Sequence, residues 1–326
     1  MPVEKKVVDD SPIQENLTSL LETRTAGDPD KEDIVFTDLS PAAISKRLAL
    51  MGTPACDQTI RNWLDASNIR LRKIRKDIPG GEHPDRDSQF QNIAALIERY
   101  ERDGNPCFSI DTKAKEHLGF LYRKGRVRCS SPFLSFDHDF PSWATGVLIP
   151  HGIYDHQNLR GHINIGLSHG TNAFACDSFA WYWNRIGRLR YPDATSILIT
   201  CDCGGSNSSR KYIFKHDLQQ LANRLGIELR IAHYPTYCSK YNPIERRFFS
   251  HLGRACSGML FDTLDTVVSL MRKASTTTGL RTTVNVIKRF YEIGRNATPE
   301  MKQNLKIIFD ELLPSWNYRA APQSGQ

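Results

Sequence analysis

The feature that most limits how this chain can fold is an alternation of apolar strands and amphipathic helices that begins at Asn105. Segments with the apolar or alternating pattern of strands occupy 107–112, 119–128, 144–155, 161–168, 196–202 and 228–235. Helical spacing of apolar residues occupies 172–188, 208–225 and 242–255, and further helices are expected toward the C-terminus. The first strands follow one another directly, and the later strands alternate with helices. This order predicts an α/β domain in which some neighbouring strands of the sheet are parallel.

Three acidic side chains occupy positions at which this pattern brings them together. Asp111 ends the strand 107–112, Asp202 ends the strand 196–202, and Glu245 lies in the first turn of the helix 242–255. The ends of neighbouring parallel strands converge at one edge of a sheet, and a helix that starts beside that edge adds a third group. Taken singly, an Asp at a strand end also fits a turn, and Glu245 also fits the helix dipole. Their joint order in a β-β-β-α-β-α-β-α pattern is that of the ribonuclease H-like plan, a mixed sheet flanked by helices.

A cluster of three carboxylates implies a cation. The three groups cannot all stay ionised at close range without a compensating positive charge. Hard divalent ions with oxygen ligands supply it, and Mg²⁺ is the usual choice. We expect Asp111 and Asp202 to bridge two Mg²⁺ ions and Glu245 to ligate one of them, with Mn²⁺ as a substitute. Two such ions activate an attacking oxygen and stabilise a leaving oxygen at phosphorus.

The charge distribution favours a polyanionic partner. The whole chain carries a formal net charge of +7. Its first 40 residues contain ten Asp or Glu against four Lys or Arg, so the remaining 286 residues carry +13. A basic body of this kind suits nucleic acid, although a basic solvated surface is the alternative interpretation.

A pair of short helices is predicted ahead of the α/β part. Ser40 is placed to cap the first helix, with Pro41 at its first position. Asp57 is placed to cap the second. The side chains expected on the buried faces are Ile44, Leu48 and Met51 in the first helix and Ile60, Trp63 and Leu64 in the second. Two helices joined by a turn that contains Gly52 predict a helix-turn-helix, and a helical hairpin with a solvated tail is the alternative.

Polar and basic side chains at these positions suit contacts with base edges and phosphates. The candidates on the second helix and in the basic run after it are Gln58, Thr59, Arg61, Asn62, Arg70, Arg72, Lys73, Arg75 and Lys76. Further candidates flank the three acids, where they would face the phosphate backbone: Lys113, Lys115, Arg123, Lys124, Arg126, Lys240 and Arg246. We therefore predict DNA as the partner.

Composition divides the chain into four parts. Residues 1–36 form an acidic, weakly ordered leader, in which one short helix fits around 13–23. Residues 37–76 hold the predicted helix-turn-helix with its basic tail. Residues 77–104 combine a linker rich in Pro, Gly and charge with a helix that starts near Phe90. Residues 105–326 form the ribonuclease H-like domain with C-terminal helices.

Several longer motifs make the chain recognisable. They are GDPD (27–30), GGEHPDRDSQF (80–90), SIDTKAKEHLGFLYRKGR (109–126), HDFPS (138–142), PHGIYD (150–155), WYWNRIGRLRYPDATSILITCDCGGSNSSR (181–210), HYPTYCSKYNPIERRFFSHL (233–252), TTTGLR (276–281) and SWNYRAAP (315–322). With these segments the chain resembles the DDE transposases of bacterial insertion sequences, and specifically the Rhodopirellula-type family. The resemblance covers nearly the whole chain.

The resemblance implies an activity and a set of partners. Asp111, Asp202 and Glu245 stand where the catalytic triad of the family stands. The implied reaction is Mg²⁺-dependent cleavage and strand transfer at the DNA ends of a mobile element, followed by attack of the freed 3′-hydroxyl on target DNA. The implied partners are the terminal repeats, target DNA and at least one further copy of the chain. The implied location is the bacterial cytoplasm, on the nucleoid.

Three departures from the family pattern leave two alternatives open. A further DNA-binding helical segment usually precedes the position of Met1, so we expect a shortened chain. Cys203 stands where the family tends to have Gly, and the run 236–241 differs from the usual sequence. The alternatives to an active transposase are a truncated, inactive relative that binds DNA, and a ribonuclease H-like nuclease without strand transfer.

Other classes find no support in the sequence. No apolar run approaches the 18 residues that a transmembrane helix needs, and residues 1–17 lack the apolar region of a secretory signal. The eight cysteines contain no CxxC pair, which disfavours both a disulfide scaffold and a zinc site. No GxxxxGK[ST] motif indicates an ATPase.

Overall fold

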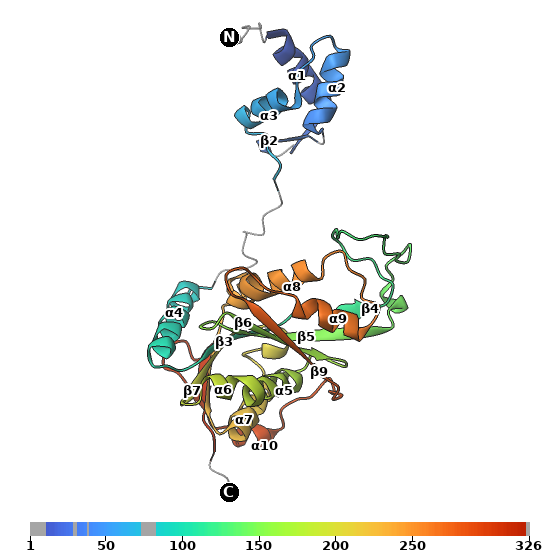
Figure 1. The fold of residues 1–326 in the computed structure, drawn as a ribbon. Coiled ribbons are helices and arrows are strands. Elements are labelled where there is room, and N and C mark those ends of the chain that lie inside the picture. The colour runs from blue at the N-terminus through green and yellow to red at the C-terminus, as the bar shows by residue number, and fades with distance from the viewer. Residues whose placement is uncertain (1–10, 29–30, 38, 73–82, 324–326) are drawn as a thin grey trace. The chain divides into compact units, whose positions relative to one another are not determined.

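A computed structural model of the chain describes residues 11–28, 31–37, 39–72 and 83–323 (Figure 1). The chain divides into two compact units, Met1–Asp77 and Ile78–Gln326. Each unit has its own apolar core within the described residues. The basic positions Lys73, Arg75 and Lys76 lie outside the described residues.

The first unit is a small helical domain with a two-stranded hairpin. Its elements are α1 (Ser11–Arg24), β1 (Thr25–Asp28), β2 (Lys31–Thr37), α2 (Pro41–Leu50) and α3 (Asp57–Ala66). Strands β1 and β2 are antiparallel. The three helices pack around one buried cluster, whose members are Leu17, Ile44, Leu48, Ile60 and Leu64. The predicted leader thus contributes helix α1 to this core through Leu17.

The two predicted helices of this unit form, with small differences at their ends. The Ser40 hydroxyl accepts a hydrogen bond from the Ala43 amide, and Pro41 is the first helical residue, as predicted. Asp57 was wrongly predicted as a cap: it is itself the first helical residue, and Cys56 occupies the capping position without a side-chain hydrogen bond. Met51, predicted on the buried face, lies just after the end of α2 at Leu50 and is exposed.

The second unit contains a nine-stranded mixed sheet. Its strands are β3 (Cys107–Thr112), β4 (Glu116–Leu118), β5 (Gly146–Asp155), β6 (Arg160–Gly166), β7 (Ser196–Cys201), β8 (Glu228–His233), β9 (Arg281–Ile287), β10 (Ile307–Phe309) and β11 (Asn317–Ala320). The order is β10-β11-β8-β7-β3-β5-β6-β9, and β4 pairs with β5 beside this path. Strands β3, β7 and β8 run parallel, and β5 is antiparallel to both β3 and β6.

This order defines the fold class. The five central strands β6-β5-β3-β7-β8 read 3-2-1-4-5 in chain order, with only the second antiparallel to its neighbours. That is the ribonuclease H-like arrangement, and the predicted α/β fold with a mixed sheet is confirmed.

Helices cover both faces of the sheet (Figure 1). They are α4 (Arg86–Arg102), α5 (Asn172–Tyr182), α6 (Arg188–Arg190), α7 (Tyr212–Leu225), α8 (Ser250–Ala255), α9 (Leu264–Arg272) and α10 (Pro299–Gln303). Phe108 and Ile110 of β3 pack in the cluster beneath α5 and α7. Cys107, which alternates with them, packs against α4 on the other face. Because α4 shares this core with the central strands, it belongs to the same compact unit as the sheet.

The predicted strand 119–128 was wrong. The segment is irregular beyond β4, apart from a single bridge between Gly119 and Phe261. Gly119 has φ 125° and Gly125 has φ 137°, which strands do not accommodate. Arg123, Lys124 and Arg126 therefore lie on a loop between β4 and β5, whereas Lys113 and Lys115 lie between β3 and β4.

Candidate active site

Asp111 and Asp202 sit side by side at the ends of two parallel strands. Strands β3 and β7 pair from Cys107 with Leu198 to Ser109 with Thr200. Asp111 and Asp202 each lie two positions beyond this last pair, Asp111 within β3 and Asp202 just after the end of β7. Since side chains alternate along a strand, Asp111 points away from the face that holds Ile110 and toward the face of α4 and α8.

Glu245 reaches this edge because the helical segment that carries it lies directly on the sheet. Glu245 begins a turn of π-helix, η5 (Glu245–Phe249), that continues into α8. Gly152 of β5 stands opposite Asp111 in the antiparallel ladder. A Cβ at Gly152 would lie 2.9 Å from Ile244 Cδ1 and would overlap the Phe249 ring. The absent side chain thus leaves the space that η5 occupies.

A buried amide fixes the start of the same segment. Asn242 and Pro243 begin the helix as predicted, and the Glu245 amide donates to the Asn242 carbonyl at 3.1 Å. The Asn242 side chain turns inward, where its Nδ2 donates to the Ile110 carbonyl at 3.2 Å. This bond joins the Glu245 helix to the strand residue just before Asp111.

The electrostatics show that the three acids form one cluster. Burial, followed by the charge of Asp202, raises the pKa of Asp111 from 3.8 to about 8. Glu245 adds to this shift through its charge and a side-chain hydrogen bond with Asp111. Burial also raises the pKa of Asp202, against hydrogen bonds from the Gly204 amide and the Asn207 side chain. Asp111 therefore interacts with both Asp202 and Glu245, and its raised pKa favours the protonated form at neutral pH.

The donor set suits a cation that the substrate helps to hold. Asp202 Oδ1 is buried and has no hydrogen-bond partner within the described part of the chain. Among those residues, no three His, Cys, Asp or Glu side chains are grouped closely enough to hold an ion by themselves. Mg²⁺ in proteins usually takes one or two carboxylates and completes its shell with water and substrate phosphates. The residues present fit an ion of that kind rather than a closed structural metal site.

The basic residues predicted to flank the acids differ in exposure and in partners. Lys113 and Arg123 are half-buried, and both bind the buried carboxylate of Glu116, Arg123 at 2.8 Å. The Arg123 guanidinium also lies 3.6 Å above the Phe261 ring. Lys115, Lys124, Arg126 and Arg246 are exposed, whereas Lys240 is half-buried beside the Tyr241 ring. The exposed set is free to meet a phosphate backbone, whereas Lys113 and Arg123 stabilise Glu116.

In the first unit, the predicted DNA-contact residues lie on or just after α3. Gln58, Arg61 and Asn62 are exposed, and Thr59 is half-buried. The Gln58 amide donates to Asn62 Oδ1 at 3.0 Å. Arg70 pairs with Asp65 at 3.2 Å, and Arg72 donates to Asn68 Oδ1 at 2.7 Å. These contacts hold the side chains on the surface without burying them.

Sequence reasoning missed several residues that shape the cluster. Asn242 was predicted only as the start of the helix 242–255, and Gly152 and Asn207 were given no role at the acids. The Asn-Pro dipeptide at 242–243 and the Gly within an apolar strand at 152 were the available signals.

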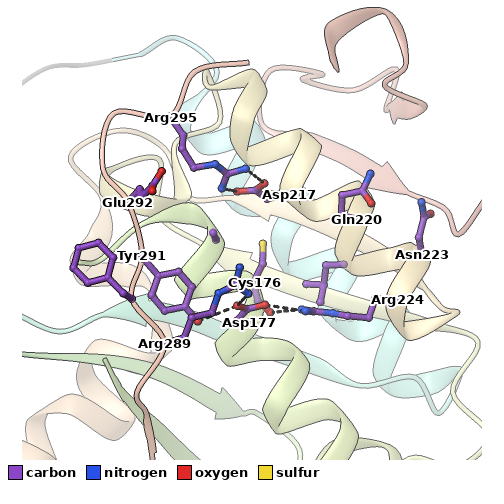
Figure 2. A pocket seen from close by; sticks show the side chains of 13 residues that line it. Cys176, Asp177, Asp217, Gln220, Asn223, Arg224, Arg289, Tyr291, Glu292 and Arg295 are labelled. Carbon is purple, nitrogen blue, oxygen red and sulfur yellow. Dashed lines mark hydrogen bonds and ion pairs between the residues drawn. The ribbon is translucent and has the colours of Figure 1, made fainter. Parts of the chain in front are cut away.

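A cavity of about 770 Å³ lies away from this cluster, between α5, α7 and the segment 289–295 (Figure 2). Its charged groups face one another. Asp177 accepts hydrogen bonds from Arg224, Arg289 and the Tyr291 hydroxyl at 2.8–2.9 Å. Asp217 accepts two from Arg295 at 2.9 and 3.0 Å. Because the carboxylates and arginines are paired, we interpret them as fastening the segment 289–295 to the two helices.

Within the described part of the chain, no helix combines the length and the apolar character that crossing a membrane requires.

The sequence matches a known family. Residues 16–322 match the family described as Rhodopirellula transposase DDE domain. The chain therefore belongs to that family, and the resemblance found from its motifs is confirmed. Membership supports a transposase and thus an enzyme of nucleotidyl transfer.

Comparison with the curated proteins found none that matches this chain. Among solved structures, the Mos1 transposase paired-end complex with left transposon end is 16% identical, with a TM-score of 0.41 over 82% of this chain and 70% of that one. The Mos1 mariner paired-end complexes with Mn and with Mg are 16% and 15% identical. Each has a TM-score of 0.41 over 82% of this chain and 71% of the other.

Proposed function

We propose that the chain is a DNA transposase that cleaves and joins the ends of an insertion sequence at Asp111, Asp202 and Glu245. The observation that carries this proposal is the shared electrostatics of three acids at one sheet edge, which raises the pKa of Asp111 to about 8. A structural cluster of carboxylates gains nothing from such repulsion, whereas a cation-binding site uses it. Membership of a DDE transposase family supports the reaction class.

Asp111, Asp202 and Glu245 would hold divalent cations, with Mg²⁺ expected and Mn²⁺ as a substitute. The unpartnered Asp202 Oδ1 supports this assignment, since a buried carboxylate oxygen otherwise lacks compensation. When bound, the cations supply activation of the attacking oxygen and stabilisation of the leaving oxygen at phosphorus.

The protein's own groups prepare the site in a defined way. Without a cation, the protonated Asp111 shares a hydrogen bond with Glu245. Asp111 would ligate a cation in its ionised form and would give up its proton to do so. The Gly204 amide and the Asn207 side chain hold the Asp202 carboxylate while one of its oxygens stays unpartnered. The Asp202 carboxylate is thus held in a fixed orientation before a cation and a phosphodiester bind.

DNA binding is assigned to two surfaces, each within its own unit. On the first unit, α3 presents Gln58, Arg61 and Asn62. On the second, the predicted contact residues that are exposed are Lys115, Lys124, Arg126 and Arg246. Since two element ends must be joined in one reaction, we infer that the active form contains at least two copies of the chain.

The test is a joining assay with a labelled duplex that carries the ends of the native element, Mg²⁺ and a target plasmid. We expect cleaved ends and joined products. In Asp202→Asn and Glu245→Gln both products disappear, while a gel-shift assay still shows DNA binding. Cleavage without joining would indicate a nuclease, and binding without either product would indicate an inactive relative. Joined products from either variant at the wild-type rate would refute the assignment of the triad.

A further inference from the structure

The structure places the C-terminal motif SWNYRAAP (315–322) one strand away from the strand that leads to Asp202. Residues Asn317–Ala320 form β11, which pairs antiparallel with β8, Tyr318 with Ile231. The His233 amide, at the end of β8, donates to the Trp316 carbonyl at 2.9 Å. The last strand of the chain therefore borders the strand that adjoins β7, the strand that leads to Asp202.

The backbone carbonyl of Asp202 accepts its hydrogen bond from a side chain rather than from a backbone amide. The parallel ladder between β7 and β8 ends with Cys201 and His233, and the Tyr234 amide takes the Cys201 carbonyl at 2.8 Å. The chain then leaves the sheet. The next carbonyl, that of Asp202, accepts a hydrogen bond from His233 Nδ1 at 2.9 Å. Because a carbonyl only accepts, Nδ1 carries the proton.

A second hydrogen bond selects this tautomer. The Tyr318 hydroxyl lies 2.8 Å from His233 Nε2. Both side chains are fully buried, and burial favours the neutral form of an imidazole ring. A neutral ring with its proton on Nδ1 has an acceptor at Nε2, so the Tyr318 hydroxyl donates to it. The bonds run in one direction, from Tyr318 to His233 and on to the Asp202 carbonyl.

The ring is held from its backbone as well. Gln89 of α4 donates to the His233 carbonyl at 2.9 Å and to Asn317 Oδ1 at 3.0 Å. Asn317 Nδ2 donates back to Gln89 Oε1 at 2.7 Å. Gln89 and Asn317 are fully buried. Three elements that are distant in the sequence thus converge on His233.

We propose that His233 and Tyr318 are positioning residues, which fix the peptide of Asp202 and thereby aim its carboxylate into the acidic cluster. The inference rests on the proposed function, since it assigns a purpose to the position of Asp202. Groups that orient a metal ligand typically change metal affinity or activity 10- to 100-fold when they are removed. The C-terminal motif then acts on the site through one hydroxyl.

Two substitutions of His233 separate positioning from mere packing. Asn places its amide nitrogen where His has Nδ1, so His233→Asn keeps the donor to the Asp202 carbonyl. Gln places its amide nitrogen nearer the position of Nε2, so His233→Gln loses that donor. Asn leaves the larger void, so it is expected to be the less stable of the two. Packing alone therefore predicts the higher activity for His233→Gln, and positioning predicts it for His233→Asn.

The experiment measures DNA cleavage at subsaturating Mg²⁺ together with Mn²⁺ affinity, which electron paramagnetic resonance reports for the full chain without DNA. We expect His233→Gln to lose about 10- to 100-fold in both quantities, and His233→Asn to lose less despite a lower melting temperature. Tyr318→Phe should weaken both quantities as well. Tyr100→Phe is the matched control, because its hydroxyl binds Ser196 Oγ at 2.7 Å at the opposite end of β7. Equal losses in Tyr318→Phe and Tyr100→Phe, or higher activity in His233→Gln, would overturn the proposal.

A third measurement needs no activity. Nitrogen-15 NMR of labelled histidine, with the His233 signals identified by their loss in His233→Gln, should show the proton on Nδ1 in the wild type and a mixture of tautomers in Tyr318→Phe. A proton on Nε2 in the wild type would refute the relay even if the protein cleaves DNA. If the proton is on Nδ1 but the protein binds no Mn²⁺ and cleaves no DNA, the result would count against the proposed function and not against the hydrogen-bonded relay.

Discussion

Replacement of Asp111 by Asn should stabilise the protein when no divalent metal is present. Burial and the charges of Asp202 and Glu245 make the ionised Asp111 unfavourable, which is why its pKa rises from 3.8 to about 8. Between these two values the folded state binds a proton that the unfolded state has lost. Stability therefore falls as the pH rises from about 4 to about 8. Asn is neutral throughout, and its amide can donate to Glu245 as the protonated carboxyl does.

The size of the effect follows from the shift. Each pH unit between the two pKa values costs about 1.4 kcal/mol, so the stability difference between Asp111→Asn and the wild type grows by about 4 kcal/mol from pH 4 to pH 7. For a domain of about 250 residues, 1 kcal/mol moves the melting temperature by about 2–4 °C. We expect a rise of roughly 10 °C at pH 7 and little difference at pH 4.

The assay is thermal unfolding of the metal-free chain, followed by circular dichroism in EDTA from pH 4 to pH 8. Asp262→Asn is the matched control, because Asp262 also accepts a hydrogen bond from the next amide but is exposed. Addition of Mg²⁺ should stabilise the wild type and leave Asp111→Asn nearly unchanged. A variant that is no more stable than the wild type at pH 7, or a gain that does not depend on pH, would refute the assignment of a strained carboxyl at this position.

Three further predictions concern the surroundings of the cluster. Gly152→Ala should slow DNA cleavage, because the new methyl group collides with the helical segment that carries Glu245. Gly253→Ala on α8 is the control: space around its Cβ is open, so this variant should cleave at the wild-type rate. Asn242→Ala should cost about 1–3 kcal/mol in denaturant unfolding, since the Ile110 carbonyl loses its side-chain partner, and a cost near zero would contradict this role. Lys115→Gln should lower the salt dependence of DNA binding by about one phosphate contact. Lys113→Gln should mainly reduce stability, because Glu116 loses an ion-pair partner. A larger change in salt dependence for Lys113→Gln than for Lys115→Gln would contradict this assignment of the two lysines.

Much of the fold was predictable because it depends on local patterns. The buried strands 107–112, 196–202 and 228–235 are apolar runs, and the structure has strands in all three places. The mixed sheet with parallel neighbours and the position of the two Asp residues at strand ends then followed from general rules of α/β sheets. The strand expected at 119–128 failed because two glycines there adopt positive φ, a choice that the apolar pattern does not reveal.

The finer structure of the site depends on contacts between distant segments. Gly152 matters because the ring of Phe249 lies above it, 97 positions later in the chain. His233 matters because Tyr318 and Asp202 approach it from two sides. Neither relation leaves a periodic signal in the sequence. The sequence therefore proposed which acids form the site, and the structure was needed to find the contacts around each of them.

The most direct test of the central claim is cleavage of a labelled duplex that carries the native element ends, measured with Mg²⁺ and with EDTA for the wild type, Asp202→Asn and the control Asp262→Asn. We predict nicking by the wild type and by Asp262→Asn only when Mg²⁺ is present, and none by Asp202→Asn, with DNA binding retained in all three. Cleavage by Asp202→Asn at the wild-type rate, or cleavage by the wild type in EDTA, would contradict a metal-dependent site built on Asp111, Asp202 and Glu245.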